Sequence, residues 1–173
     1  MSIQIIEFKA KVADINEHEA KLLLLKPLFI GVDEQTDTYF NVPTGRLKLR
    51  EGNIENSLIY YERENLKGTK QSNVLLYKHL PDKTLKEILV KTHGVKTIVH
   101  KKRKIYFIDN VKFHFDTVDR LGSFIEVEAI DNTGTIGIEK LQEQCDHYAA
   151  YFGIQTADYV EFSYSDLLIN HAF

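Results

Sequence analysis

Hydrophobic and polar residues alternate along most of this chain, as they do in strands that have one apolar face. The alternation is repeated often enough to predict about eight strands, separated by short turns. The predicted strands cover residues 3–12, 37–41, 46–51, 57–63, 73–78, 97–108, 111–118 and 123–130. Strands that follow one another through short turns favour a meandering antiparallel sheet, and a sheet of this size can close into a barrel.

Helical periodicity replaces the alternation in a few places. The predicted helices cover residues 15–25, 83–92 and 137–152, with a last short turn at 165–169. Asp14 and Asp82 are suitable N-cap residues for the first two, and Gly94 and Gly153 are suitable residues after a helix end. With few prolines and no low-complexity stretch, residues 1–173 are expected to form a single domain.

The polar faces of the predicted strands are almost entirely charged. In "NVPTGRLKLREG", Arg46, Lys48 and Arg50 share one face of a strand, while Leu47 and Leu49 share the other. A single strand of this kind is typical of a sheet with one solvated face. Because the charged pattern returns in strand after strand, we favour an α+β fold: a closed antiparallel eight-stranded β-barrel with charged residues inside and helices packed on its apolar outside.

Composition narrows the classes of function. The formal net charge is −3, so an anion site must be a local concentration of cations, and a nucleic-acid-binding protein is not favoured. No apolar run approaches the roughly 20 residues of a membrane helix, and the N-terminus lacks the features of a signal peptide, so we expect a cytoplasmic protein without membrane contact. The one cysteine, Cys145, lies in a helical pattern and is expected to be a buried structural thiol.

Several segments together resemble the CYTH superfamily of triphosphate tunnel proteins, and within it the class IV adenylate cyclase-like branch. The resemblance extends over nearly the whole chain in matching order. The segments are "EFKAKV", "TDTYFNVPTGRLKLREG", "LIYYERENLKGTKQS", "VHKKRKIYF", "NVKFHFDTVDRLGSFIEVEA" and "SYSDLL".

The resemblance implies a tunnel in which basic residues bind a triphosphate and carboxylates hold Mg²⁺ or Mn²⁺. The implied triphosphate-binding residues are Lys9, Lys11, Lys48, Arg50, Arg63, Lys78, Lys101 and Arg103. The implied metal ligands are Glu7, Asp116, Glu126 and Glu128, and Tyr39 occupies an aromatic position bordering the site, which makes it the candidate catalytic residue. The candidate cations outnumber the candidate carboxylates, so a polyanion such as ATP is the expected partner.

One position departs from the family pattern. The N-terminal signature of the family is E-x-E-x-K, but here Ile5 stands in place of the first glutamate, while Glu7 and Lys9 are retained. Isoleucine cannot bind a metal ion, so the number of metal ions is left open.

Three functions remain open at this stage. The first is a class IV adenylate cyclase-like reaction that converts ATP to 3′,5′-cyclic AMP and pyrophosphate. The second is hydrolysis of an inorganic or organic triphosphate, such as tripolyphosphate or thiamine triphosphate. The third, which the substitution at Ile5 supports, is a triphosphate-binding protein without turnover. Some relatives are dimers, so a homodimer is also considered.

The remaining polar residues have simpler interpretations. The histidines, among them His79 and His114, lack metal-ligand spacing and are expected to lie on the surface or to pack. Residues 64–72 are expected to form a hairpin tip with solvated lysines, including Lys70. The tail at 159–164 is expected only to pack against the barrel.

Overall fold

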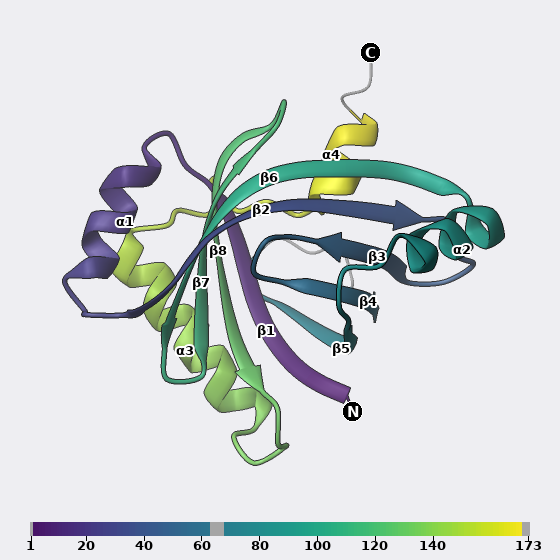
Figure 1. Ribbon diagram of the computed structural model, residues 1–173. Coiled ribbons are helices and arrows are strands. Elements are labelled where there is room, and N and C mark those ends of the chain that lie inside the picture. Colours follow the sequence, from purple (N-terminus) through teal and green to yellow (C-terminus); the bar gives the residue numbers. More distant parts are fainter. Residues whose placement is uncertain (1, 63–67, 171–173) are drawn as a thin grey trace.

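The computed structural model describes residues 2–62 and 68–170, and it forms one closed antiparallel barrel (Figure 1). The strands are β1 (Ser2–Lys11), β2 (Leu28–Phe40), β3 (Arg46–Glu51), β4 (Asn56–Glu62), β5 (Lys70–Lys78), β6 (Val95–Ile108), β7 (Val111–Val118) and β8 (Gly122–Asp131). They pair in the order β1-β5-β4-β3-β2-β6-β7-β8, and β1 closes the ring by pairing with β8. The predicted eight-stranded barrel is therefore confirmed.

Four helices lie outside the barrel wall or at its end. They are α1 (Ile15–Leu23), α2 (Lys83–His93), α3 (Ile138–Phe152) and α4 (Tyr164–Asn170). The side chain of Asp14 caps α1, that of Asp82 caps α2, and Gly94 and Gly153 follow their helices with positive φ, as the sequence predicted. Among the described residues, no helix is both long enough and apolar enough to span a membrane.

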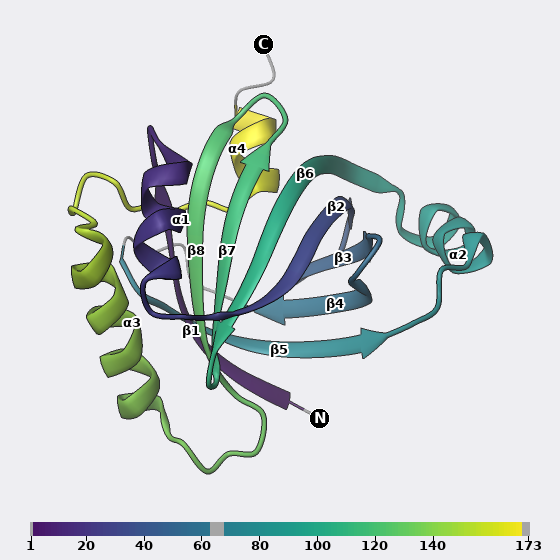
Figure 2. The same cartoon turned by 60° about the vertical axis from the view of Figure 1, so that its left-hand side comes forward.

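The main hydrophobic core lies between the barrel and helices α1 and α3. Helix α3 lies along the outside of the barrel (Figure 2) and contacts β1 and β8. Outward-facing residues of β1, β7 and β8, such as Phe8, Phe113 and Val127, are fully buried in the same cluster as Cys145 and Phe152 of α3. The Cys145 thiol donates to the Ile6 carbonyl oxygen at 3.1 Å, and burial raises the pKa of Cys145 to about 12. The expectation of a structural thiol is confirmed.

The C-terminal segment packs against one end of the barrel interior. Tyr164 and Leu168 of α4 contact Val99, Val118 and Phe124, whose side chains face inward near that end. On the side of the molecule away from α1 and α3, helix α2 covers the outer face of β2 and β3 (Figure 1). The interior is thus bordered by the tail at one end.

The second strand differs most from the sequence prediction. It was expected to begin at residue 37, but β2 begins at Leu28 and pairs with the long strand β6 along most of its length. The residues of its first part are exposed on both faces, and Gly31 adjoins a register shift, so no alternation marks the strand there. Cross-strand pairing with β6 decides the structure of this segment.

Candidate functional site

The barrel encloses a cavity of about 720 Å³ that contains most of the predicted site residues. The charged residues that line it are Glu7, Lys9, Lys48, Arg50, Glu55, Lys78, Lys101, Arg103, Lys112, Glu126 and Glu128. A second hollow of about 970 Å³ lies beside Arg46 and Asp166, but it contains none of the clustered metal-ligating side chains described below. We therefore place the site inside the barrel and refer to this cavity as the tunnel.

Asp37 of β2 gathers three cations on one side of the tunnel. Arg50 donates to both carboxylate oxygens of Asp37 at 2.9 Å, Lys101 donates at 2.7 Å, and the Lys48 ammonium lies 3.3 Å away. Burial would raise the pKa of Asp37, but Arg50, Lys101 and Lys48 outweigh it and hold the pKa well below the usual value. Asp37 thereby holds the three cations close together.

Arg103 of β6 organises a second, neighbouring group of charged side chains in the tunnel. It makes a two-pronged contact with Asp116, at 2.7 and 2.6 Å, and reaches Glu126 at 2.9 Å. Lys9 lies 3.3 Å from the other oxygen of Glu126 and 4.0 Å from the ring centre of Tyr164. The Tyr164 hydroxyl donates to Asp116 at 2.7 Å, so the tail residue joins the same network.

Glu55 lies in the turn between β3 and β4 and connects Arg50, a partner of Asp37, with Lys112 on the other side of β6. It accepts from Arg50 at 3.0 Å and from Lys112 of β7. Asp33 holds this turn in place. Its buried carboxylate accepts hydrogen bonds from the backbone amides of Ile54 and Glu55, both at 2.9 Å. Asp33 therefore positions Glu55 within reach of Arg50.

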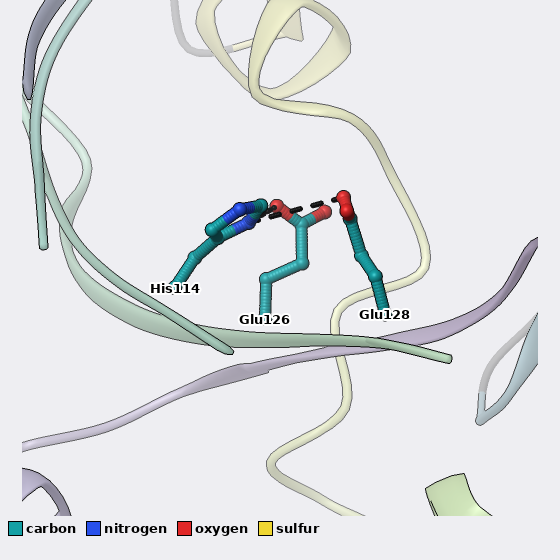
Figure 3. A group of neighbouring side chains, drawn as sticks. All are labelled: His114, Glu126 and Glu128. Atoms are coloured by element: carbon teal, nitrogen blue, oxygen red, sulfur yellow. Dashed lines mark hydrogen bonds and ion pairs between the residues drawn. The ribbon is translucent and has the colours of Figure 1, made fainter. Parts of the chain in front are cut away.

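A compact group of possible metal ligands lies on β7 and β8. Figure 3 shows His114, Glu126 and Glu128 side by side, pointing away from the strands into the barrel. The His114 Nδ1 atom lies 3.2 Å from Glu126 and 3.8 Å from Glu128, and one ligand atom from each residue falls within 4.8 Å of the others. The His114 Nε2 atom is buried and has no hydrogen-bond partner among the described residues.

The electrostatics of this group suit a divalent cation. Burial, with help from Arg103 and Lys112, lowers the pKa of His114 to about 3, so the imidazole is neutral and can act as a ligand. Burial and the neighbouring Glu126 raise the pKa of Glu128 to about 7, and a cation would relieve that repulsion. A set of one imidazole and two carboxylates therefore fits a metal ion such as Mn²⁺.

The tunnel brings together most, but not all, of the predicted residues. Tyr39 also lines the tunnel, and its hydroxyl lies 3.5 Å from the Lys48 ammonium. Asp116 is paired with Arg103 and does not belong to the group of His114, Glu126 and Glu128. Lys11 is exposed at the end of β1, and Lys78 is exposed at the rim of the tunnel. Arg63 lies outside the described residues.

Several residues of the site were missed by the sequence reasoning. His114 was expected to be a surface or packing residue, but it is 1% exposed and lies inside the barrel. Tyr164 was expected only to pack with the tail, and it also bonds to Asp116. Lys70, expected to be solvated, is buried and donates to the Val160 carbonyl oxygen at 2.9 Å because β5 begins there.

The balance of charge in the tunnel also differs from the expectation. The sequence reasoning omitted Asp37, Glu55 and Lys112, and it counted Lys11 and Lys78, which are exposed. The interior cations are Lys9, Lys48, Arg50, Lys101, Arg103 and Lys112, and the acidic residues are Glu7, Asp37, Glu55, Asp116, Glu126 and Glu128. Among the described residues, cations and carboxylates in the barrel interior are therefore equal in number, and the expected excess is not seen there; Arg63, which the expectation counted, lies outside these residues. Buried charges of both signs compensate each other, as a low-dielectric interior requires.

Comparison with solved structures finds the same fold in proteins of very different origin. The PH1012 protein of Pyrococcus horikoshii is 25% identical, with a TM-score of 0.79 over 94% of this chain and 98% of that chain. A candidate adenylate cyclase of Vibrio parahaemolyticus is 18% identical, with a TM-score of 0.78 over 95% and 97%.

A third similar structure is the adenylyl cyclase candidate HpAC1 of Hippeastrum, described as having a dominant triphosphatase activity. It is 13% identical, with a TM-score of 0.62 over 98% of this chain and 94% of that chain. No curated protein matches the sequence. The family model of the CYTH domain matches residues 4–164, and proteins of this family generally depend on a divalent metal. The chain belongs to the CYTH family.

Proposed function

We propose that the protein is a divalent-metal-dependent enzyme that acts on a triphosphate bound in the tunnel. One observation carries the proposal: Glu126 and Glu128 line the same cavity as a dense set of cations, His114 lies 3.2 Å from Glu126, and Arg103 contacts Glu126 directly. Phosphoryl chemistry needs this combination because charge must be neutralised on the attacked and departing phosphates.

The cations that now contact Asp37 are suited to bind phosphate oxygens. Arg50, Lys48 and Lys101 already point toward one carboxylate, and phosphate oxygens offer the same kind of acceptor with more charge. His114, Glu126 and Glu128 would hold the divalent cation, which orients phosphate oxygens and neutralises their charge. Arg103 and Lys9, on the same side, would stabilise negative charge that develops on the leaving group.

The first candidate reaction is the class IV adenylate cyclase reaction on ATP. In it the 3′-hydroxyl attacks the α-phosphorus, its proton is lost, and pyrophosphate departs. The segments that contain Tyr39, Lys48, Arg50 and the β7–β8 hairpin support it, because they resemble the cyclase-like branch. The Vibrio protein, described as a candidate adenylate cyclase, supports it as well.

The second candidate is hydrolysis of a triphosphate, in which water attacks the terminal phosphorus, the diphosphate departs and orthophosphate is formed. The described activity of the Hippeastrum protein supports it, and the same cations and metal-ligating group would serve both reactions. A protein that binds triphosphate without turnover is the third candidate, and Ile5 is the residue that supports it.

Product analysis distinguishes these reactions. The protein is incubated with ATP or tripolyphosphate and with Mg²⁺, Mn²⁺ or EDTA, and the products are separated by chromatography. We expect cyclic AMP and pyrophosphate from ATP only when a divalent cation is present. Orthophosphate without cyclic AMP would assign the protein to the hydrolases, and bound ATP without product would leave a binding protein. If neither compound is bound or converted, the proposal is wrong.

A further inference from the structure

The tunnel has an apolar wall that the phosphate chemistry does not use. Ile5 of β1 packs against Ile59 and Tyr61 of β4 and against Val74 of β5, and all of these side chains line the tunnel. Ile3 and Leu76 extend the same wall. The substitution of the family glutamate at Ile5 therefore belongs to a continuous apolar surface.

The register of the strands gives this wall its shape. Ile3 pairs with Val74, Val74 with Tyr61, and Leu76 with Ile59, so the side chains come from three adjacent strands. Adjacent strands lie about 4.8 Å apart, and alternate residues along a strand about 7 Å apart, so three strands present an apolar face of about 10 Å by 7 Å. A face of this size matches the plane of a fused-ring base.

The wall also begins next to the metal-ligating group. Glu7 pairs with Glu128, and two residues earlier Ile5 pairs with Ile130. Ile5 is therefore the inward-facing residue of β1 next to the Glu7–Glu128 pair. An organic group attached to a phosphate beside Glu128 would therefore meet Ile5. Ser72, which pairs with Ile5, adds a buried hydroxyl that has no partner among the described residues and can bond to a ribose or a ring edge.

We propose that the apolar wall of Ile3, Ile5, Ile59, Tyr61, Val74 and Leu76 binds the flat ring of a nucleoside triphosphate, so that this enzyme prefers an organic triphosphate to inorganic tripolyphosphate. The proposal rests on the proposed function, because it requires the triphosphate to lie in the tunnel. Ile5 is then a specificity residue and not merely a lost ligand. A carboxylate at this position would lie against Ile59 and Val74, where burying a charge is unfavourable.

Binding without turnover tests the proposal. ATP and tripolyphosphate are titrated separately into the protein by calorimetry in EDTA, which prevents a metal-dependent reaction. We expect wild-type protein to bind ATP at least about tenfold more tightly than tripolyphosphate, since losing a small part of an apolar contact typically costs about tenfold. Ile5→Asn should reduce ATP affinity about tenfold and leave tripolyphosphate affinity within about twofold.

Two further variants make the result specific. Leu75→Asn is the matched control because Leu75 lies on β5 next to the wall but is 52% exposed on the outside, and it should change neither affinity. Leu76→Asn should repeat the effect of Ile5→Asn if that variant does not fold. Equal wild-type affinities for the two ligands, or ATP binding that is unchanged in the wall variants, would overturn the proposal while leaving the proposed function intact. Failure of the wild type to bind either ligand, both in EDTA and when the titration is repeated with Mg²⁺, would instead contradict the proposed function.

Discussion

Replacing Glu126 by glutamine is expected to lower metal-dependent turnover by roughly 10²–10³-fold, the usual cost of removing one group that stabilises the transition state. Glu126 lies at the centre of the site, since it contacts His114 at 3.2 Å, Arg103 at 2.9 Å and Lys9 at 3.3 Å. The neutral amide weakens cation binding and leaves Lys9 without this counter-charge. The loss is measured as kcat together with the Mn²⁺ dissociation constant from calorimetry.

Glu34→Gln is the control for that substitution. The Glu34 side chain is 76% exposed on the outer face of β2 and faces Lys102 only at 4.0 Å, so its loss should alter neither quantity. Circular dichroism shows whether both variants keep the fold. A Glu126→Gln protein that is folded, binds Mn²⁺ as the wild type does and turns over normally would remove Glu126 from the site.

Replacing Asp37 by asparagine is expected to destabilise the ligand-free protein by about 3–5 kcal/mol, because it removes the shared partner of two buried cations, Arg50 and Lys101, and of the partly buried Lys48. The Asp37 side chain is 1% exposed and contacts Arg50, Lys101 and Lys48. For a chain of this size the loss corresponds to a decrease in Tm of about 10 °C. Tripolyphosphate should restore much of the Tm, because its oxygens supply the missing negative charge.

Asp109→Asn is the matched control, since Asp109 is exposed in the turn between β6 and β7. It should leave Tm nearly unchanged both with and without tripolyphosphate. The two Tm differences are read from thermal unfolding followed by circular dichroism. An Asp37→Asn protein that is as stable as the wild type would contradict the role of Asp37 as the shared counter-charge. A destabilised variant whose Tm tripolyphosphate does not raise would show that these cations do not bind the triphosphate.

The alternation of charged and apolar residues was sufficient to predict the barrel and much of its interior. Lys48 and Arg50 alternate with Leu47 and Leu49, and Glu126 and Glu128 alternate with Val127, so period two assigns their faces directly. The closed barrel follows because each of these strands needs partners on both sides. Which face turns inward was decided by the repetition of charge across strands, and the structure agrees.

Other parts of the site depend on contacts between distant residues, which the local sequence pattern does not predict. Asp37 begins the predicted strand 37–41, but only the pairing of β2 with β3 places it opposite Arg50, and Glu55 belongs to a turn that is held by Asp33. Tyr164 reaches Asp116 from a tail far along the chain. His114 is different, because the alternation already placed it on the face of Lys112 and Asp116, and a search for ligands across neighbouring strands would have paired it with Glu126.

The isoleucine at position 5, where the family has a glutamate, is interpreted differently once its surroundings in the structure are known. From the sequence alone, Ile5 indicates a missing ligand and supports loss of turnover. In the barrel, the metal-ligating group on β7 and β8 forms without that position, and Ile5 contacts the apolar side chains of β4 and β5. The departure is therefore compatible with an active enzyme that binds a single cation.

The most direct test of the account is pulsed electron paramagnetic resonance of Mn²⁺ bound to the protein in the presence of ATP. The account predicts a ¹⁴N coupling from His114 and a ³¹P coupling from ATP in the same complex, because an imidazole and phosphate oxygens would share one cation. In His114→Gln the ¹⁴N coupling should disappear while the ³¹P coupling remains. Mn²⁺ that binds ATP in the wild type without any ¹⁴N coupling would contradict the assignment of the metal centre.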